Sequence, residues 1–242
     1  MGPYGSGKTE VSINYALARL ASAPCRGRHG VAIIDLDVVT PYFRTREVRE
    51  ELEALGLSVI TPPGAVSRTD LPVIPPEARG AIENESLEVI IDVGGDPAGA
   101  RAFGSLAGYA RPSGLRILFV VNASRPFTRT PQEIVHYVRE IEAAMGRSCT
   151  GLVSNTHLGP HTTESIVKDG RAVAAAAGRV LGLDIVLTGV PEFMEGAAPA
   201  RLLVADGEIL PLRLFMKPPW ETAAWRMGRV LREASGLQRG EV

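Results

Sequence analysis

Short apolar runs alternate along the chain with longer segments in which apolar residues recur every three or four positions. The short runs are typical of buried strands in a parallel sheet, and the longer periodicity is typical of amphipathic helices. The predicted strands are residues 31–37, 57–60, 87–92, 115–122, 150–155 and 184–190. The predicted helices are residues 9–20, 44–55, 77–84, 130–145, 163–181 and 221–234. This order predicts a doubly wound, mostly parallel α/β sheet flanked by helices.

The most specific motif is GPYGSGKT at residues 2–9, which fits the phosphate-binding pattern G-x-x-x-x-G-K-[ST] at every fixed position. Glycines let the backbone turn so that several N–H groups point at phosphate oxygens. We expect Lys8 to reach the β- and γ-phosphates and the Thr9 hydroxyl to bind Mg²⁺. The residues predicted to bind nucleotide here are Gly2, Gly5, Ser6, Gly7, Lys8, Thr9 and Glu10.

A phosphate-binding loop (P-loop) ordinarily follows a buried strand, but only Met1 precedes this one. We therefore expect that the first strand is missing from this chain and that the chain as written starts at an internal methionine. A sheet without that strand leaves its two neighbours with unpaired backbone groups.

The C-terminal part differs from the alternating series. Residues 202–215 form two apolar runs around Asp206-Gly207, which predicts an antiparallel hairpin at the sheet edge. No linker or repeat interrupts the chain, so we expect a single domain over residues 1–242. Within it, residues 1–195 form the predicted nucleotide-binding core, and residues 196–242 form the hairpin and final helix.

Acidic residues stand at two predicted strand ends, where ligands bind in open α/β sheets. Asp92 follows a largely apolar run and is predicted to hold Mg²⁺, with residues 92–96 as a switch loop. Asp35 and Asp37 share one strand end, so one could order a metal-bound water and the other the attacking water. We assign Thr9, Asp35 and Asp92 to the metal site. Solvation of a strand end is the alternative for each acid.

Basic residues near the strand ends give weaker signals. Arg44 and Arg125 each lie just past a predicted strand and could neutralise phosphate charge, or serve only on the surface. His157 and His161 are four residues apart, but Gly-Pro between them excludes a helix, so a metal pair is not expected.

Composition excludes several other classes of protein. Of the 242 residues, 45% are hydrophobic and 22% are charged, which is ordinary for a globular domain. The net charge of −1 gives no reason to expect nucleic-acid or membrane binding. Cys25 and Cys149, the two cysteines, fit a reducing cytoplasm and are interpreted as buried inert thiols.

Taken together, these motifs resemble the MinD/ParA/CobQ-type ATPases of the SIMIBI class, which includes nitrogenase iron protein and dethiobiotin synthetase. The resemblance rests on the P-loop and on residues 34–37, 92–96, 155 and 190–192, and it spans the chain to about residue 195. A bacterial and archaeal branch with D-L-D-x-V-x-P-Y-F-R, here residues 35–44, and D-V-G-G-D is the most similar.

The resemblance implies roles for individual residues. Asp37 resembles the switch I acid implicated in hydrolysis, and Asp92 resembles the switch II acid. With Lys8 they form the implied catalytic set. Asn155 resembles the asparagine that reads the adenine edge, while Pro191 and Glu192 resemble the segment that closes over the base. No N-K-x-D signature for guanine is present, so ATP is expected over GTP.

One position departs from the family. The class marks its P-loop with an early lysine that reaches a partner's nucleotide across a dimer, and here that position is Pro3. A homodimer stays possible, but the family's activation across the dimer cannot simply be carried over.

Three functions are compatible with these residues. The first is an ATP-binding protein with Mg²⁺-dependent ATPase activity that acts as a nucleotide switch or as a maturation or assembly factor. The second is an ATP-dependent small-molecule transferase or ligase of the CobQ or dethiobiotin synthetase type. The third is a nucleotide-regulated binding module without turnover. A protein client or a small-molecule substrate is the expected partner.

Overall fold

The computed structural model describes residues 1–22, 30–36, 45–62, 74–194 and 207–216. Its helices are α1 (Lys8–Ser22), η2 (Thr45–Val48), α2 (Arg49–Ala54), α3 (Pro76–Glu83), α4 (Pro97–Leu106), η4 (Pro112–Gly114), α5 (Pro131–Met145), α6 (Glu164–Leu181) and η5 (Glu192–Met194). Its strands are β1 (Gly30–Leu36), β2 (Ser58–Ile60), β3 (Leu87–Val93), β4 (Leu118–Val121), β5 (Gly151–Ser154), β6 (Ile185–Pro191) and β7 (Glu208–Leu212). Strands and helices alternate, which confirms the predicted α/β class.

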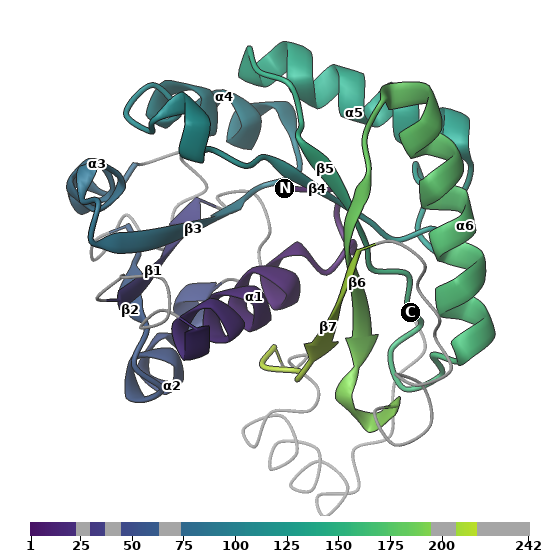
Figure 1. Cartoon of the computed structure of the whole chain (residues 1–242), viewed down its shortest axis with the longest axis horizontal. Helices are drawn as coiled ribbons and strands as arrows, with labels where there is room; N and C mark the ends of the chain where they lie inside the picture. The colour runs from purple at the N-terminus through teal and green to yellow at the C-terminus, as the bar shows by residue number, and fades with distance from the viewer. Residues whose placement is uncertain (23–29, 37–44, 63–73, 195–206, 217–242) are drawn as a thin grey trace, which may run out of the picture.

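The strands form two parallel groups (Figure 1). One group has the order β2-β1-β3 and the other the order β4-β5-β6-β7. Every strand pair among the described residues is parallel. The carboxyl ends of all strands within each group therefore lie at one edge, where ligands bind in this kind of sheet.

Between the two groups, β3 and β4 are not hydrogen-bonded to each other. Met1 lies beside β4: its N–H group donates to Leu118 O at 3.0 Å, and its carbonyl accepts from Val120 N at 2.7 Å. On the other side, a Cβ at Gly95 would overlap the carbonyl oxygen of Gly2. The P-loop thus begins between the carboxyl ends of β3 and β4, with no described strand in that place.

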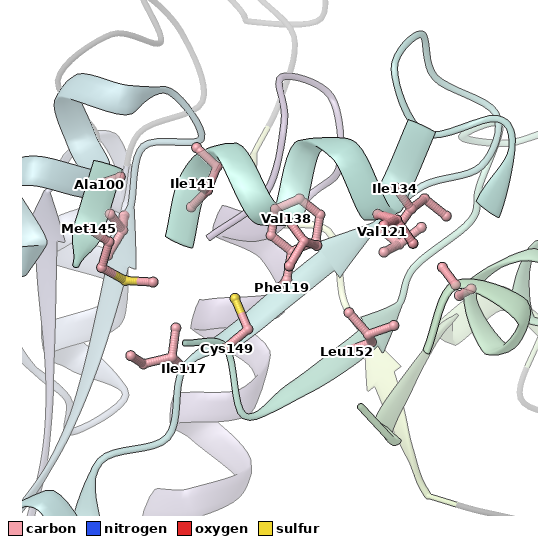
Figure 2. Close-up of a cluster of buried hydrophobic side chains, with 14 of the residues drawn as sticks. Ala100, Ile117, Phe119, Val121, Ile134, Val138, Ile141, Met145, Cys149 and Leu152 are labelled. Carbon is pink, nitrogen blue, oxygen red and sulfur yellow. The ribbon is translucent and has the colours of Figure 1, made fainter. Parts of the chain in front are cut away.

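The helices cover both faces of the β4–β7 group. Side chains alternate between the two faces along a strand, so neighbours in β4 pack on different helices. Val120 belongs to a buried cluster with Val11 of α1. Phe119 and Val121 instead pack under α5 against residues such as Ile134 (Figure 2). Helix α5 packs between α4 and α6 on this second face.

Helix α5 has capping residues at both ends. Thr130 Oγ1 accepts from Glu133 N at 3.2 Å, and the Glu133 carboxylate accepts from Thr130 N at 3.1 Å. Pro131 occupies the first turn, and Gly146 ends the helix in a left-handed conformation with φ of 69°. This capping box satisfies N–H groups that the first turn cannot bond internally.

One part of the fold prediction is wrong. Strand β7 pairs in parallel with β6, with Leu187 opposite Glu208 and Pro191 opposite Leu212, so it is not an antiparallel hairpin arm. The long connection from residue 192 to residue 207 gives the chain room for the crossover that a parallel pair needs. Residues 202–206 and the predicted helix 221–234 lie outside the described residues.

Helix α4 was not predicted. It begins at Pro97 after Asp96, whose Oδ1 accepts from Ala98 N at 2.7 Å and Gly99 N at 3.1 Å. Of the two cysteines, Cys149 is buried in the core of Figure 2, and burial raises the pKa of its thiol to about 12. Cys25 lies outside the described residues.

Candidate nucleotide-binding site

The P-loop has the backbone shape that phosphate binding requires. Gly5 and Gly7 take left-handed conformations with φ of 76° and 78°, which a side chain would disfavour. Ser6 N donates to Pro3 O at 3.1 Å, which closes a turn before α1 begins. Lys8 is the first residue of that helix and is buried. Free N–H groups at a helix start, together with a buried lysine, make an anion-binding concavity.

Two buried asparagines hold this loop from the neighbouring strands. Asn155, which follows β5, donates its Nδ2 to Ser6 O at 2.8 Å. Asn122, which follows β4, donates its Nδ2 to Gly5 O at 3.2 Å. Both side chains fix carbonyl oxygens of the loop and so help to aim its N–H groups at a ligand. The structure places Asn155 at the loop, and its role in reading adenine stays a prediction.

The two described acids lie side by side. Asp35 of β1 and Asp92 of β3 are opposite each other in the parallel register, and both are buried. Asp92 accepts hydrogen bonds from Ser12 Oγ at 3.4 Å and Thr45 Oγ1 at 3.1 Å. Ser12 lies in the helix that Lys8 begins, so Asp92 is brought to the first turns of α1.

Asp35 is engaged by a cation. Its Oδ2 lies 2.7 Å from Arg46 Nε and accepts from Arg46 N at 3.2 Å. Asp92 is therefore bonded to Thr45, and Asp35 is bonded to Arg46. These two consecutive residues begin η2. This short helix directly follows residues 37–44, which lie outside the description and include the predicted Asp37.

The oxygen groups present fit a nucleotide with Mg²⁺. Ser6 Oγ is buried and has no hydrogen-bond partner among the described residues, so a phosphate oxygen could accept from it. Thr9 is buried at the loop end, and Asp92 is held nearby through Ser12. Within the described part of the chain, no group of three or more His, Cys, Asp or Glu residues could hold a metal. Mg²⁺ suits such a site, because it takes one or two carboxylates plus waters and ligand phosphates.

Glu10 has a different environment from the rest of the predicted set. Its carboxylate accepts from Phe215 N at 3.1 Å and Met216 N at 2.7 Å, which fastens the segment after β7 to α1. Asn14, one turn later, exchanges two hydrogen bonds with the Arg213 backbone, at 2.9 and 3.0 Å. The carboxylate of Glu10 therefore bonds the protein's own backbone.

The remaining predicted residues lie at the end of β6. Pro191 is the buried last residue of that strand and pairs with Leu212 of β7. Glu192 is exposed and begins η5. The structure thus brings the predicted loop residues, Asp35, Asp92 and Asn155 to the carboxyl ends of their strands.

Sequence reasoning missed several residues that shape this site. Asn122 donates to the P-loop carbonyl of Gly5, and Thr45 donates to the carboxylate of Asp92. Tyr137 of α5 donates its hydroxyl to Gly95 O at 2.9 Å and so fixes the predicted switch loop. Asn122 had a usable signal, because it directly follows an apolar run. Tyr137 had no such signal, because a single tyrosine on an amphipathic helix does not indicate which group its hydroxyl contacts.

Comparison with known proteins shows the fold. No family model and no curated protein matches the chain. Among solved structures, the cell division protein FtsY of Thermotoga maritima is similar, with a TM-score of 0.50 and 20% identity. The match covers 78% of this chain and 60% of that one. D-threo-3-hydroxyaspartate dehydratase of Delftia sp. HT23 matches at a TM-score of 0.36 and 17% identity, covering 83% of this chain and 57% of that one.

The likeness to FtsY, at 20% identity, shows the α/β fold alone. It agrees with the parallel sheets flanked by helices. The α/β fold is therefore shown, and the ligand of the loop is not addressed by this likeness. None of the described helices is both long enough and apolar enough to span a bilayer.

Proposed function

We propose that the chain binds ATP with Mg²⁺, hydrolyses it slowly, and uses the bound nucleotide to set the conformation of two switch segments. The observation that carries this proposal is the joining of the P-loop helix to Asp92 and Thr45 by hydrogen bonds. These contacts connect the phosphate site with the segment that follows residues 37–44. A ligand bound at the P-loop would therefore act on Asp92 and Thr45.

Each residue has a role in this proposal. The loop N–H groups and Lys8 bind the phosphate chain, and Ser6 Oγ offers a further donor. Thr9 and Asp92 would hold Mg²⁺, which when bound neutralises charge on the phosphates. Asp37 is the proposed group that orients the attacking water. Asp35 positions the start of η2 through Arg46.

The proposed switch behaviour rests on the hydroxyl groups that contact Asp92. Asp92 is held at 3.1 and 3.4 Å by hydroxyl groups, which a metal ion or phosphate could replace. The following Gly95 is packed on Gly2 and bonded by Tyr137, so movement at the loop is passed to α5. Order in these segments would then depend on the terminal phosphate.

The base preference is proposed from sequence. Residues 155–158 read N-T-H-L and not the N-K-x-D signature that recognises guanine, so adenine is favoured. Competition of labelled ATP by unlabelled ATP and GTP tests this preference. We expect unlabelled ATP to compete more strongly, and equal competition by the two nucleotides would refute the adenine assignment.

Phosphate release with Mg²⁺ tests turnover. We expect Asp37→Ala to bind ATP but to lose most of its hydrolysis, because an acid beside the attacking water acts chiefly in the transition state. Asp169→Ala, at an exposed position on α6, is the matched control and should keep the wild-type rate. An Asp37→Ala protein with wild-type turnover would contradict the assignment. Nucleotide binding without turnover in the wild type would favour the binding-module alternative.

A client protein or small-molecule substrate is proposed as the second partner. Turnover that rises on adding a metabolite, with transfer of phosphate to it, would favour the transferase alternative. Any homodimer would need a different activating cation from the family's early lysine, because Pro3 occupies that position.

A further inference from the structure

The loop between β4 and α5 is held rigidly beside the P-loop. Asn122 O accepts from Thr128 Oγ1 at 2.7 Å and from Arg125 N at 3.0 Å. Asn122 Oδ1 accepts from Ser124 N at 3.0 Å, while its Nδ2 bonds the P-loop carbonyl of Gly5. One buried asparagine therefore fixes this loop and the P-loop to each other.

The side chain of Arg125 lies against the P-loop backbone. A Cβ placed on Gly5 would be 3.1 Å from Arg125 Nε and 3.3 Å from its Cδ. Arg125 is exposed, and its guanidinium makes no hydrogen bond or ion pair with the described residues. A positive charge therefore lies against the predicted phosphate-binding loop, and no carboxylate among the described residues pairs with it.

His157 completes this side of the loop. Its Nε2 would be 3.3 Å from a Cβ on Gly7, and its Nδ1 accepts from Gly159 N at 3.4 Å. Because Nδ1 accepts, the proton of the neutral ring is assigned to Nε2, which faces the loop. Burial, and then the charge of Arg125, lower the pKa of His157.

The two residues differ from ordinary surface groups. A solvated arginine would extend away from the protein or pair with an acid, whereas Arg125 runs along Gly5. The charge of Arg125 disfavours protonation of His157, and an anion bound between the two groups would offset this effect. Phosphate is the anion that the loop itself selects.

We propose that Arg125 and His157 form a second wall of the nucleotide site, in which Arg125 binds the phosphate chain and His157 supplies a ring N–H donor beside it. This inference rests on the proposed nucleotide binding and adds two residues that the family motifs do not include. It favours phosphate binding by Arg125 over a role only on the surface.

Calorimetric titration with ATP, ADP and adenosine tests the role of Arg125. We expect Arg125→Ala to bind ATP at least about tenfold more weakly, as for a lost charge-assisted hydrogen bond. Arg125→Lys should recover part of the affinity, and adenosine, which lacks phosphate, should bind equally to both proteins. Arg129→Ala removes an exposed arginine from the same loop and is the matched control.

Two results would overturn the inference, and they are distinguishable. If Arg125→Ala binds ATP as tightly as Arg129→Ala does, then the inference fails while nucleotide binding stands. If the wild type binds no nucleotide, then the proposed function fails and this inference fails with it.

The titration of His157, followed by NMR, supplies a readout that a purely structural role would not move. We expect ATP to raise the His157 pKa in the wild type, because phosphate favours the protonated ring. An unchanged His157 pKa on saturation with ATP would remove His157 from the proposed wall.

Discussion

The buried carboxylate of Glu10 is expected to make the stability of the protein depend on pH. Its carboxylate is fastened to the segment after β7 by the N–H groups of Phe215 and Met216. Burial raises the pKa of Glu10 from 4.5 to about 7, although the hydrogen bonds from Met216 and Phe215 act in the opposite direction. The nearby charge of Asp92 adds a smaller increase.

The sign follows from the direction of this pKa change. A raised pKa means that the folded state holds the proton more tightly than the unfolded state does. The stability from Glu10 is therefore fully present below pH 4.5 and is lost as the pH rises through about 7. The difference between the two pKa values corresponds to about 3 kcal/mol of unfolding free energy, at 1.36 kcal/mol per pH unit.

Urea unfolding of nucleotide-free protein from pH 4.5 to pH 8 measures this effect. Glu10→Gln keeps the size of the side chain but cannot titrate, so its stability relative to wild type should rise by about 3 kcal/mol across that range. Glu140→Gln, on the exposed face of α5, should follow the wild-type profile. Parallel profiles for Glu10→Gln and wild type would refute the reasoning about the buried carboxylate.

Two further predictions concern the predicted switch loop. Tyr137→Phe removes the hydrogen bond to Gly95 O, so we expect the free energy of unfolding in urea to fall by about 1 kcal/mol and phosphate release to slow. Unchanged values for both would show that the contact is dispensable. Gly95→Ala places a methyl group on Gly2 O, and we expect it to lower the unfolding free energy by at least about 2 kcal/mol. Its matched control, Gly80→Ala in α3, meets no atom within 4 Å and should stabilise by about 0.5–1 kcal/mol, so similar effects of both substitutions would contradict the packing described.

The sequence predicts most of the fold because its signals are local. The apolar runs locate β1 to β6, and the Thr130 capping box and Gly182 mark the ends of α5 and α6. Helix α4 was missed because its sequence, PAGARAFGSL, holds two glycines and only two large apolar residues, Phe103 and Leu106. Its available signal was Asp96 followed by proline at the first helical position.

The pairing of β7 could not be predicted in the same way. Asp206-Gly207 is a turn signal, but whether a strand pairs in parallel depends on where the preceding connection leads the chain. That connection, residues 192–207, has no pattern that fixes its path.

The site shows the same division. A motif of fixed spacing located the P-loop, and the strand-end rule located Asp35 and Asp92, which the β1–β3 register then placed together. The partners of these acids could not be predicted, because Arg46 and Thr45 come from a helix whose position is set by packing. The docking of residues 213–216 on Glu10 is equally non-local.

Calorimetric titration of Mg²⁺-ATP into wild type and Lys8→Ala tests the central claim most directly. Lys168→Ala, which removes an exposed lysine paired with Glu164 on α6, is the control, and circular dichroism checks that each variant is folded. We expect saturable binding to wild type and to Lys168→Ala, and binding to Lys8→Ala that is lost or more than about tenfold weaker. Equal affinity of folded Lys8→Ala and wild type would contradict the assignment of residues 2–9 as the phosphate site.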